Sequence, residues 1–270
     1  MILNNEMPRL GMGTFRLKGN VAYESVKTAL EVGYRHIDTA QIYGNEAEVG
    51  QAILDSGIDR AELFVTTKVW NSNLNKAAFL PSVKESLTKL KMPFVDLLLI
   101  HWPAPANGEP MAEYLGELIK AQENGLARHI GLSNFTTRLL QEAQNTLPAK
   151  QIYTNQVEVH PYLQNRILRE YCAAKDISVT GYMPFAVGKV LQDDTIVKIA
   201  GQHARTPAEV VVAWELAKGL STIPSSTKRE NLRTNLNGLS LTLSHENIQA
   251  IDNLDRNDRQ AAPDCSPEWD

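Results

Sequence analysis

The sequence predicts an α/β fold, a single (β/α)8 barrel that spans all 270 residues. Eight short apolar runs follow one another along the chain, and amphipathic helical patterns lie between them. No Pro-, Gly- or Ser-rich linker divides the chain, which favours one barrel domain. A doubly wound sheet is the alternative, since Gly11-Met12-Gly13 could begin a dinucleotide fingerprint. Arg16, however, stands where that fingerprint needs its third glycine.

The apolar runs are rich in Val, Ile and Leu with little alternation, as in strands that are buried on both faces. We expect strands at residues 10–14, 35–38, 63–68, 95–101, 127–133, 152–157, 177–182 and 220–223. Between them, apolar side chains recur at helical spacing, in the sets Ala22, Val26, Ala29; Phe79, Val83, Leu87; Tyr114, Leu118, Ala121; and Val210, Ala213, Ala217.

Proline and acidic residues mark several helix starts. Thr206-Pro207 predicts an N-cap followed by the first helical residue, and another helix is expected from about Asp193. Pro81 is expected within the first turns of its helix, where it is tolerated. The last stretch, residues 256–270, contains two prolines and predicts an extended tail.

Composition excludes several classes of function. The 27 basic and 31 acidic residues give a net charge of −4, which offers no electrostatic case for nucleic acid or an anionic membrane. The two cysteines, Cys172 and Cys265, exclude a disulfide framework, and no CxxC or HExxH motif suggests a metal site. Without a secretory leader or an apolar run of about 18 residues, we expect a cytoplasmic monomer that acts on a small molecule.

Most of the expected strands finish on polar residues, namely Thr14, Asp38, Lys68, His101, Ser133-Asn134, Gln156 and Tyr182. In a barrel these ends meet at one face, which is where active sites are built. Each residue alone has a structural explanation, such as a helix cap for Asp38 or a solvated lysine for Lys68. Packing alone does not explain the whole set.

Four of the polar residues form a chemical unit: Asp38, Tyr43, Lys68 and His101. A tyrosine with a pKa of about 10 is a poor acid at neutral pH, and a nearby ammonium lowers that pKa. An aspartate keeps the ammonium charged and oriented, and a neutral imidazole can donate a hydrogen bond to a carbonyl oxygen. The set predicts a proton-donor site for carbonyl reduction without a metal.

The chain resembles the aldo-keto reductase family from end to end. The matching segments are GYRHIDTA (33–40), YGNEAEVG (43–50), DLLLIHWP (96–103), GLSNF (131–135) and NQVEVHPY (155–162). The ending APDCSPEWD and the short length are most similar to a bacterial group that reduces 2-oxoaldehydes and keto-sugar acids.

This resemblance implies that Tyr43 is the general acid, that Asp38 and Lys68 tune it, and that His101 orients the carbonyl. It also implies an NADPH cofactor. The residues implied to contact the cofactor are Thr14, Asp38, Ser133, Asn134, Gln156, Tyr182, Ser226, Lys228, Arg229 and Asn235. Among them, Ser133, Asn134 and Gln156 would hold the carboxamide, and Tyr182 would stack on the nicotinamide.

The adenine end departs from the family pattern, which reads Ile-Pro-Lys-Ser followed five residues later by arginine. Here Ser225 replaces the lysine and Asn231 stands at the arginine position. Ser226, Lys228 and Arg229 remain at a helix start, which suits a 2′-phosphate. The segment after Tyr182 is short, which predicts an open cofactor groove.

The expected substrate wall consists of Phe15 and Trp102 beside His101, with Trp269 of the tail as a lid candidate or a mere anchor. A short tail favours small carbonyl compounds, such as methylglyoxal or 2,5-diketo-D-gluconate, the latter reduced to 2-keto-L-gulonate. Two other functions stay open: a redox-sensing module that binds the cofactor without turnover, and a structural protein recruited from an enzyme.

Overall fold

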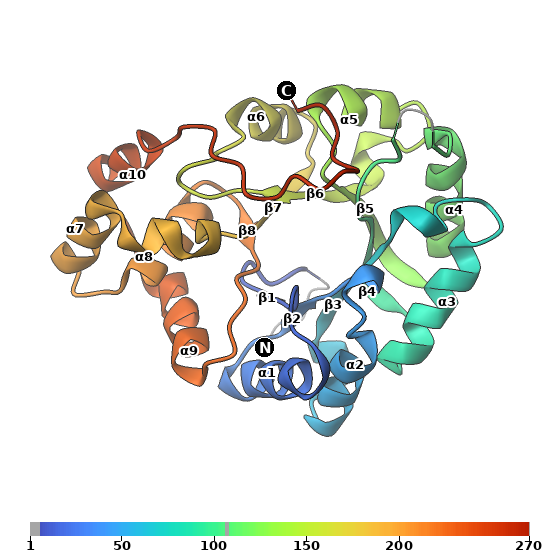
Figure 1. Cartoon of the computed structure of the whole chain (residues 1–270), viewed down its shortest axis with the longest axis horizontal. Helices are drawn as coiled ribbons and strands as arrows, with labels where there is room; N and C mark the ends of the chain where they lie inside the picture. The colour runs from blue at the N-terminus through green and yellow to red at the C-terminus, as the bar shows by residue number, and fades with distance from the viewer. Residues whose placement is uncertain (1–5, 106–107, 270) are drawn as a thin grey trace.

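The computed structural model describes residues 6–105 and 108–269 and contains one sheet of eight parallel strands in sequence order (Figure 1). The strands are β1 Met12–Gly13, β2 His36–Asp38, β3 Phe64–Val69, β4 Val95–Ile100, β5 Ala127–Ser133, β6 Ile152–Glu158, β7 Ser178–Tyr182 and β8 Ser221–Thr222. Each lies within a few residues of its predicted run, so the predicted strands are confirmed.

The sheet closes on itself between its first and last strands. Leu10, just before β1, forms a parallel bridge with Thr222 of β8. The amide of Gly11 donates to the Thr222 carbonyl at 2.9 Å, and the Thr222 amide donates to the Arg9 carbonyl at 2.8 Å. A closed parallel sheet is a barrel, so the (β/α)8 fold is confirmed and the doubly wound alternative was wrong.

Helices surround the barrel (Figure 1). In the described residues they are α1 Gly19–Val32, α2 Glu46–Asp55, α3 Phe79–Leu90, α4 Met111–Glu123, α5 Thr137–Ala143, α6 Arg166–Ala174, α7 Asp194–Gln202, α8 Pro207–Ala217, α9 Arg229–Asn237 and α10 His245–Asp252. The Tyr34 hydroxyl, just after α1, donates to the Leu232 carbonyl in α9 at 3.2 Å, so the two ends of the helical ring meet.

Local sequence signals explain where several helices begin and end. Thr206 caps α8 as predicted, and Glu209 completes a capping box with it. Pro81 is the third residue of α3, where its missing amide costs no helical hydrogen bond. Gly33 ends α1 with φ of 116°, a left-handed conformation that glycine adopts without strain.

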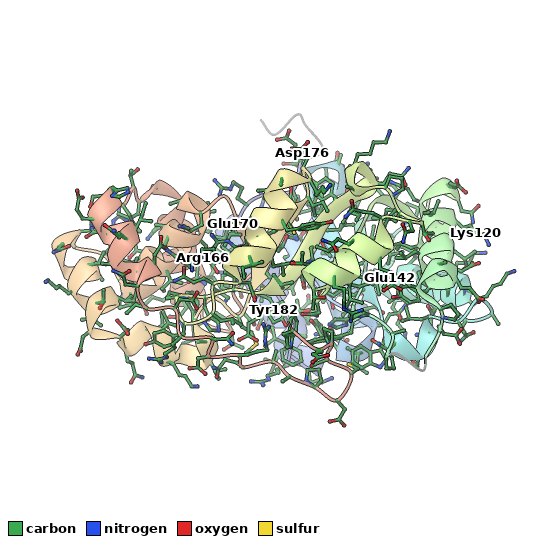
Figure 2. All side chains as sticks on the ribbon, turned by 90° about the horizontal axis from the view of Figure 1, so that it is seen from above. Lys120, Glu142, Arg166, Glu170, Asp176 and Tyr182 are labelled. Carbon is green, nitrogen blue, oxygen red and sulfur yellow. The ribbon has the colours of Figure 1, made fainter. Side chains whose placement is uncertain are left out.

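The two ends of the barrel differ. Figure 2 shows Asp176, which precedes β7, at the upper face of the molecule and Tyr182, which ends β7, well below it toward the other face. At the amino-terminal face Met7, Phe64 and Tyr153 fill the interior with Leu97 and Leu99. The carboxyl-terminal face is therefore the open one.

The chain after α10 runs as a tail toward the open face. Residues 256–269 form neither helix nor strand, and Figure 1 shows this red segment crossing near β6 and β7. The extended tail is as predicted, although its last residue, Asp270, lies outside the described residues. Within the part of the chain that the structure describes, no helix has the length and apolar character needed to span a membrane.

Candidate active site

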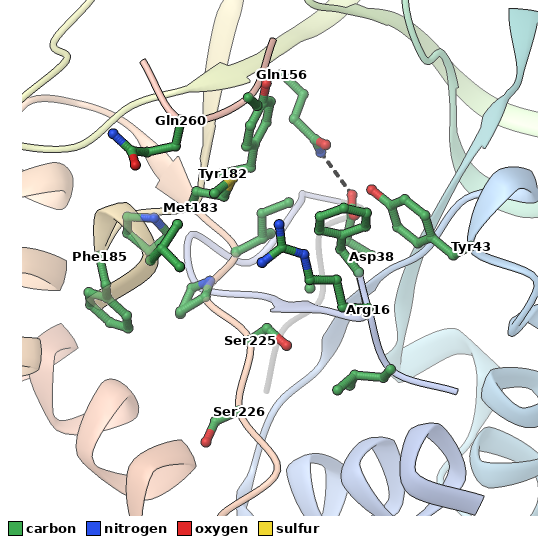
Figure 3. Close-up of a pocket in the computed structure, with 18 of the residues that line it drawn as sticks. Arg16, Asp38, Tyr43, Gln156, Tyr182, Met183, Phe185, Ser225, Ser226 and Gln260 are labelled. Carbon is green, nitrogen blue, oxygen red and sulfur yellow. Dashed lines mark hydrogen bonds between the residues drawn. The ribbon is translucent and has the colours of Figure 1, made fainter. Parts of the chain in front are cut away.

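A cavity of about 700 Å³ opens at the carboxyl ends of the strands (Figure 3). Of the residues predicted to form the site, those that line it are Phe15, Asp38, Tyr43, His101, Trp102, Ser133, Asn134, Gln156, Tyr182, Ser226 and Lys228. The strands therefore bring together residues that are up to 213 positions apart in the sequence, from Phe15 to Lys228.

A buried ion pair lies at the base of the cavity. Lys68 of β3 donates from Nζ to Oδ1 of Asp38 at 2.5 Å and to the Thr39 carbonyl at 2.9 Å. The two charged side chains are 1% and 2% exposed. Burial lowers the pKa of Lys68, while the adjacent Asp38 carboxylate opposes this shift. The opposite charges of Lys68 and Asp38 thus offset each other where the ends of β2 and β3 adjoin.

Tyr43 lies on the short 3-10 helix Gln41–Tyr43, which follows β2. Its ring centroid is 5.5 Å from that of His101, and the Lys68 Nζ lies 5.2 Å from the Tyr43 ring centre. Burial, followed by the Asp38 charge, raises the pKa of Tyr43 well above its usual value. The lowering of this pKa predicted from the lysine is not found in this structure, because burial and the Asp38 charge outweigh it. The phenol is held in its protonated form.

His101 follows β4 and is almost fully buried. Burial, with a smaller contribution from the Lys68 charge, lowers the pKa of His101 well below its ordinary value, so the imidazole is neutral at pH 7. Its Nδ1 is buried and hydrogen-bonds to none of the described residues. Trp70 packs edge-on against the imidazole at a centroid distance of 5.2 Å. This is the neutral imidazole that the sequence predicted.

A chain of amides and hydroxyls links the cavity wall to Asp38. Gln156 donates to Asp38 Oδ2 at 2.8 Å, the contact dashed in Figure 3. Ser133 donates to the Gln156 carbonyl at 2.8 Å. The Asn134 Nδ2 group donates to the His101 carbonyl at 2.9 Å, while its Oδ1 accepts from the Tyr182 hydroxyl at 2.8 Å. These contacts fix the four side chains before any ligand arrives.

The start of α9 forms the other end of the cavity. Ser226, Lys228 and Asn231 line it, and the Lys228 amide donates to Ser226 Oγ at 3.2 Å. Arg229 does not line the cavity, because its guanidinium pairs with Glu31 of α1. Asn235 is buried and also lies outside the lining. The structure thus brings Lys228 to the cavity, but not Arg229 or Asn235.

Two other predicted contacts lie outside the cavity wall. Thr14 is buried, and its hydroxyl donates to the Asp38 carbonyl at 2.9 Å. Trp269 packs edge-on against Trp102 at a centroid distance of 6.2 Å, so it contacts a wall residue and does not itself form the wall. Phe15 contacts the Tyr43 ring at 5.2 Å.

The sequence missed Arg16, which lines the cavity beside Phe15. Figure 3 shows its side chain extending into the cavity, and φ of 68° places its backbone in the left-handed region. Neither Arg16 nor Lys228 forms an ion pair within residues 6–105 and 108–269. The available signal was that Arg16 follows a barrel strand, where residues of a binding site are expected. In the sequence, Arg16 served only as evidence against a glycine-rich fingerprint.

The lining fits a dinucleotide. Tyr182 and the polar groups of Ser133, Asn134 and Gln156 occupy one end, and Lys228 at a helix start occupies the other. Among the described residues, Asp38 is the carboxylate that lines the cavity, and its negative charge is offset by Lys68. Arg16 and Lys228 therefore give the cavity a net positive charge. Among those residues no cluster of His, Cys, Asp or Glu side chains could hold a metal ion.

A closed barrel with a protonated tyrosine, a buried lysine–aspartate pair and a neutral histidine at its carboxyl rim defines an oxidoreductase that acts on carbonyl groups. The chain belongs to the aldo/keto reductase family, whose model matches residues 9–256. Members of this family are NAD(P)H-dependent oxidoreductases.

Individual relatives cover nearly the whole chain. It is 51% identical over 265 residues to methylglyoxal reductase DkgB of Escherichia coli O157:H7, covering 98% of this chain and 99% of that one. It is 39% identical to glyoxal reductase of Bacillus subtilis strain 168, with 94% and 91% covered. A crystal structure provisionally assigned as 2,5-diketo-D-gluconic acid reductase B superposes with a TM-score of 0.93 at 41% identity, covering 98% and 95%.

Proposed function

We propose that this protein is an NADPH-dependent reductase of small aldehydes and ketones, with methylglyoxal and related 2-oxoaldehydes as its preferred substrates. The single observation that carries the proposal is the juxtaposition of Tyr43, Lys68, Asp38 and His101 at the base of a cavity with unpaired cations. The proposal includes a cytoplasmic monomer in one barrel domain.

The residues suggest how a carbonyl is reduced. A reduced nicotinamide would supply the hydride to the carbonyl carbon. The Tyr43 phenol, held protonated by its surroundings, donates its proton to the carbonyl oxygen as negative charge develops there. Lys68, 5.2 Å from the Tyr43 ring centre, stabilises the phenolate that remains. Neutral His101 orients the carbonyl oxygen by donating a hydrogen bond.

Preference for NADPH follows from the start of α9. Lys228 lines the cavity there without an ion-pair partner among the described residues, and the helix dipole favours an anion at the same place. A 2′-phosphate has the charge and the acceptor oxygens that this position can bind. Because Arg229 is paired with Glu31, Lys228 is the cation proposed to contact the phosphate.

The proposed substrate class rests on the wall of the cavity. Phe15 is 47% exposed and lies beside Tyr43, with Trp70 and Trp102 on the histidine side. Aromatic walls close to the acid leave room for a small carbonyl compound and little for a steroid. The name of the DkgB relative, methylglyoxal reductase, supports the 2-oxoaldehyde, and keto-sugar acids are the second candidate.

The test is NADPH oxidation with methylglyoxal, using the Tyr43→Phe variant as the matched control. The phenylalanine keeps the ring and removes the proton donor, so kcat should fall by at least about 10²-fold. NADPH binding, followed by its fluorescence, should hardly change. A near-normal kcat in Tyr43→Phe would show that Tyr43 is not the general acid.

The same assay, run as a panel, tests the substrate class. Methylglyoxal, 2,5-diketo-D-gluconate, butanal and a steroid ketone are compared by kcat/KM with the wild-type enzyme. Methylglyoxal is expected to give the highest value. A steroid ketone that wins by about tenfold, or 1.4 kcal/mol of transition-state stabilisation, would overturn the argument from the pocket.

A further inference from the structure

Glu158, the last residue of β6, has a carboxyl group that the proposed mechanism does not use. It is fully buried at 0% exposure. Within residues 6–105 and 108–269, no lysine or arginine forms an ion pair with its carboxylate. Burying a carboxylate costs free energy unless hydrogen-bond donors surround it. The groups that donate to Glu158 therefore indicate its structural role.

Two of its three partners are consecutive backbone amides of the C-terminal tail. The Gln260 amide donates to Glu158 Oε1 and the Ala261 amide donates to Oε2, each at 2.7 Å. His160 also donates to Oε1, from Nε2 at 2.8 Å. The carboxylate therefore joins β6 to a segment 102 and 103 residues further along the chain.

These two amides attach the segment that follows residue 258, where the Arg256 and Asp258 amides already donate to the Tyr162 carbonyl at 3.2 and 2.9 Å. Within residues 259–269, two backbone amides donate to groups outside the tail, and both of them donate to Glu158. Arg259 adds one side-chain contact, from Nη2 to Asn165 Oδ1 at 3.3 Å. Its guanidinium also lies 3.5 Å from the centre of the Trp269 ring, so the end of the tail packs back onto the attached segment.

The attached segment forms part of the cavity wall. Gln260, Ala261 and Pro263 line the cavity, and Figure 3 shows Gln260 near Tyr182. Glu158 does not line the cavity and can touch no reacting atom there. Its carboxylate reaches the cavity wall through hydrogen bonds to the tail, and, second to burial, its charge also raises the pKa of Tyr182.

We infer that Glu158 is a positioning residue whose carboxylate fixes the tail at the substrate mouth and so sets the binding of the carbonyl substrate. The inference rests on the proposed function, since it takes the cavity to be the substrate site. Without the two amide contacts, the wall at Gln260 and Ala261 moves away from the cavity. The substrate then binds more weakly, while the proton donor at the base stays in place.

Glu158→Gln tests this inference. Glutamine keeps the shape of the side chain but has one oxygen that can accept a hydrogen bond, whereas the carboxylate has two. The first readout is amide hydrogen exchange at Gln260 and Ala261, which needs no substrate. Exchange there should become at least about tenfold faster, while exchange in α8 stays unchanged. Glu158→Asp, which keeps the charge on a shorter side chain, should give an intermediate change and serves if the glutamine variant does not fold.

Glu209→Gln is the matched control. It also removes a buried carboxylate, but this one caps α8 and contacts Thr206 and Arg205, not the tail. If the exchange of Gln260 and Ala261 rises equally in this control, the effect is a general loss of stability and the inference falls. Unchanged exchange in Glu158→Gln overturns it as well.

The second readout separates positioning from stability. In Glu158→Gln the KM for methylglyoxal should rise about fivefold, with kcat and the NADPH Kd each changed less than about twofold. Faster exchange with an unchanged KM would show that the tail is attached but does not set the mouth, which also overturns the inference. If wild-type enzyme reduces none of the carbonyl compounds, the proposed function fails, and the exchange result still decides whether Glu158 holds the tail.

Discussion

The Tyr43 hydroxyl shows how neighbours decide the role of a residue. Burial and the Asp38 carboxylate both raise the pKa of this phenol. Lys68, which is ion-paired with Asp38 at 2.5 Å, lies close enough to oppose them but does not outweigh them. The tyrosine is therefore protonated over the whole neutral range, as an acid that delivers a proton to a carbonyl oxygen must be. His101, whose pKa is lowered by burial, stays neutral over the same range.

Cofactor choice can be tested at two adjacent residues. Lys228 lines the cavity, whereas Arg229 pairs with Glu31. A charge-assisted contact to phosphate contributes roughly 1.5–3 kcal/mol, so Lys228→Ala should weaken NADPH about tenfold or more and leave NADH nearly unchanged. Arg229→Ala is the matched control and should change neither Kd by much. Fluorescence titration measures both, and a selective loss of NADPH affinity in the arginine variant would reverse the assignment.

At the scale of elements, two loops border the same cavity. Phe15 and Arg16 come from the loop after β1, and residues 183–185 come from the loop after β7. The β7 loop continues directly into a 3-10 helix, Ala186–Gln192, and contains no long excursion that could cover the groove. Arg16 extends into the cavity from the β1 side, as Figure 3 shows.

Arg16 is expected to contact the pyrophosphate, the anionic group that NADPH and NADH share. Its left-handed backbone, with φ of 68°, is an unfavourable conformation for arginine that the loop nevertheless maintains. Arg16→Gln should weaken both cofactors about equally, by about tenfold. Arg16→Lys, which retains the charge, should recover part of the loss. Titration of each variant with both cofactors is decisive, since a loss confined to NADPH would place Arg16 at the 2′-phosphate instead.

At the scale of the whole molecule, the barrel and the cluster of site residues could be predicted from the sequence, because both follow from local patterns. Buried parallel strands are nearly continuous apolar runs, and their polar ends meet at one face once the sheet closes. Contacts between distant segments could not be predicted in this way. The pairing of Arg229 with Glu31 spans 198 residues and depends on α9 lying beside α1. The attachment of Gln260 to Glu158 depends likewise on where an irregular tail comes to rest.

A buried acid that no sequence pattern marks should contribute to how the stability of the whole barrel depends on pH. Glu215 of α8 is fully buried, and its Oε1 would lie only 3.1 Å from a Cβ placed on Gly181 of β7. Neither carboxylate oxygen has a hydrogen-bond partner among the described residues. Burial raises the pKa of Glu215 well above its ordinary value, against the opposing charge of Arg169.

The sign of the pH effect follows from proton binding. Above the unfolded-state pKa of about 4.3, the unfolded chain releases a proton that the folded chain keeps, so the free energy of unfolding falls as pH rises. Glu215→Gln removes this loss. Its stability relative to wild type should therefore increase between pH 5 and pH 8, by up to about 1.4 kcal/mol per pH unit until the folded-state pKa is reached.

Thermal unfolding followed by circular dichroism at pH 5 and pH 8 measures the difference, since each kcal/mol shifts the Tm by about 2–4 °C in a chain of this size. Glu209→Gln provides a control with no expected pH dependence in this range. Although burial alone would raise the pKa of Glu209, its contacts with Thr206 and Arg205 lower it overall. Because Glu209 is therefore ionised in both the folded and the unfolded chain above about pH 5, the stability of that variant relative to wild type should be the same at pH 5 and pH 8. A Glu215→Gln difference that is constant between the two pH values would show that Glu215 keeps the same charge in the folded and unfolded chains.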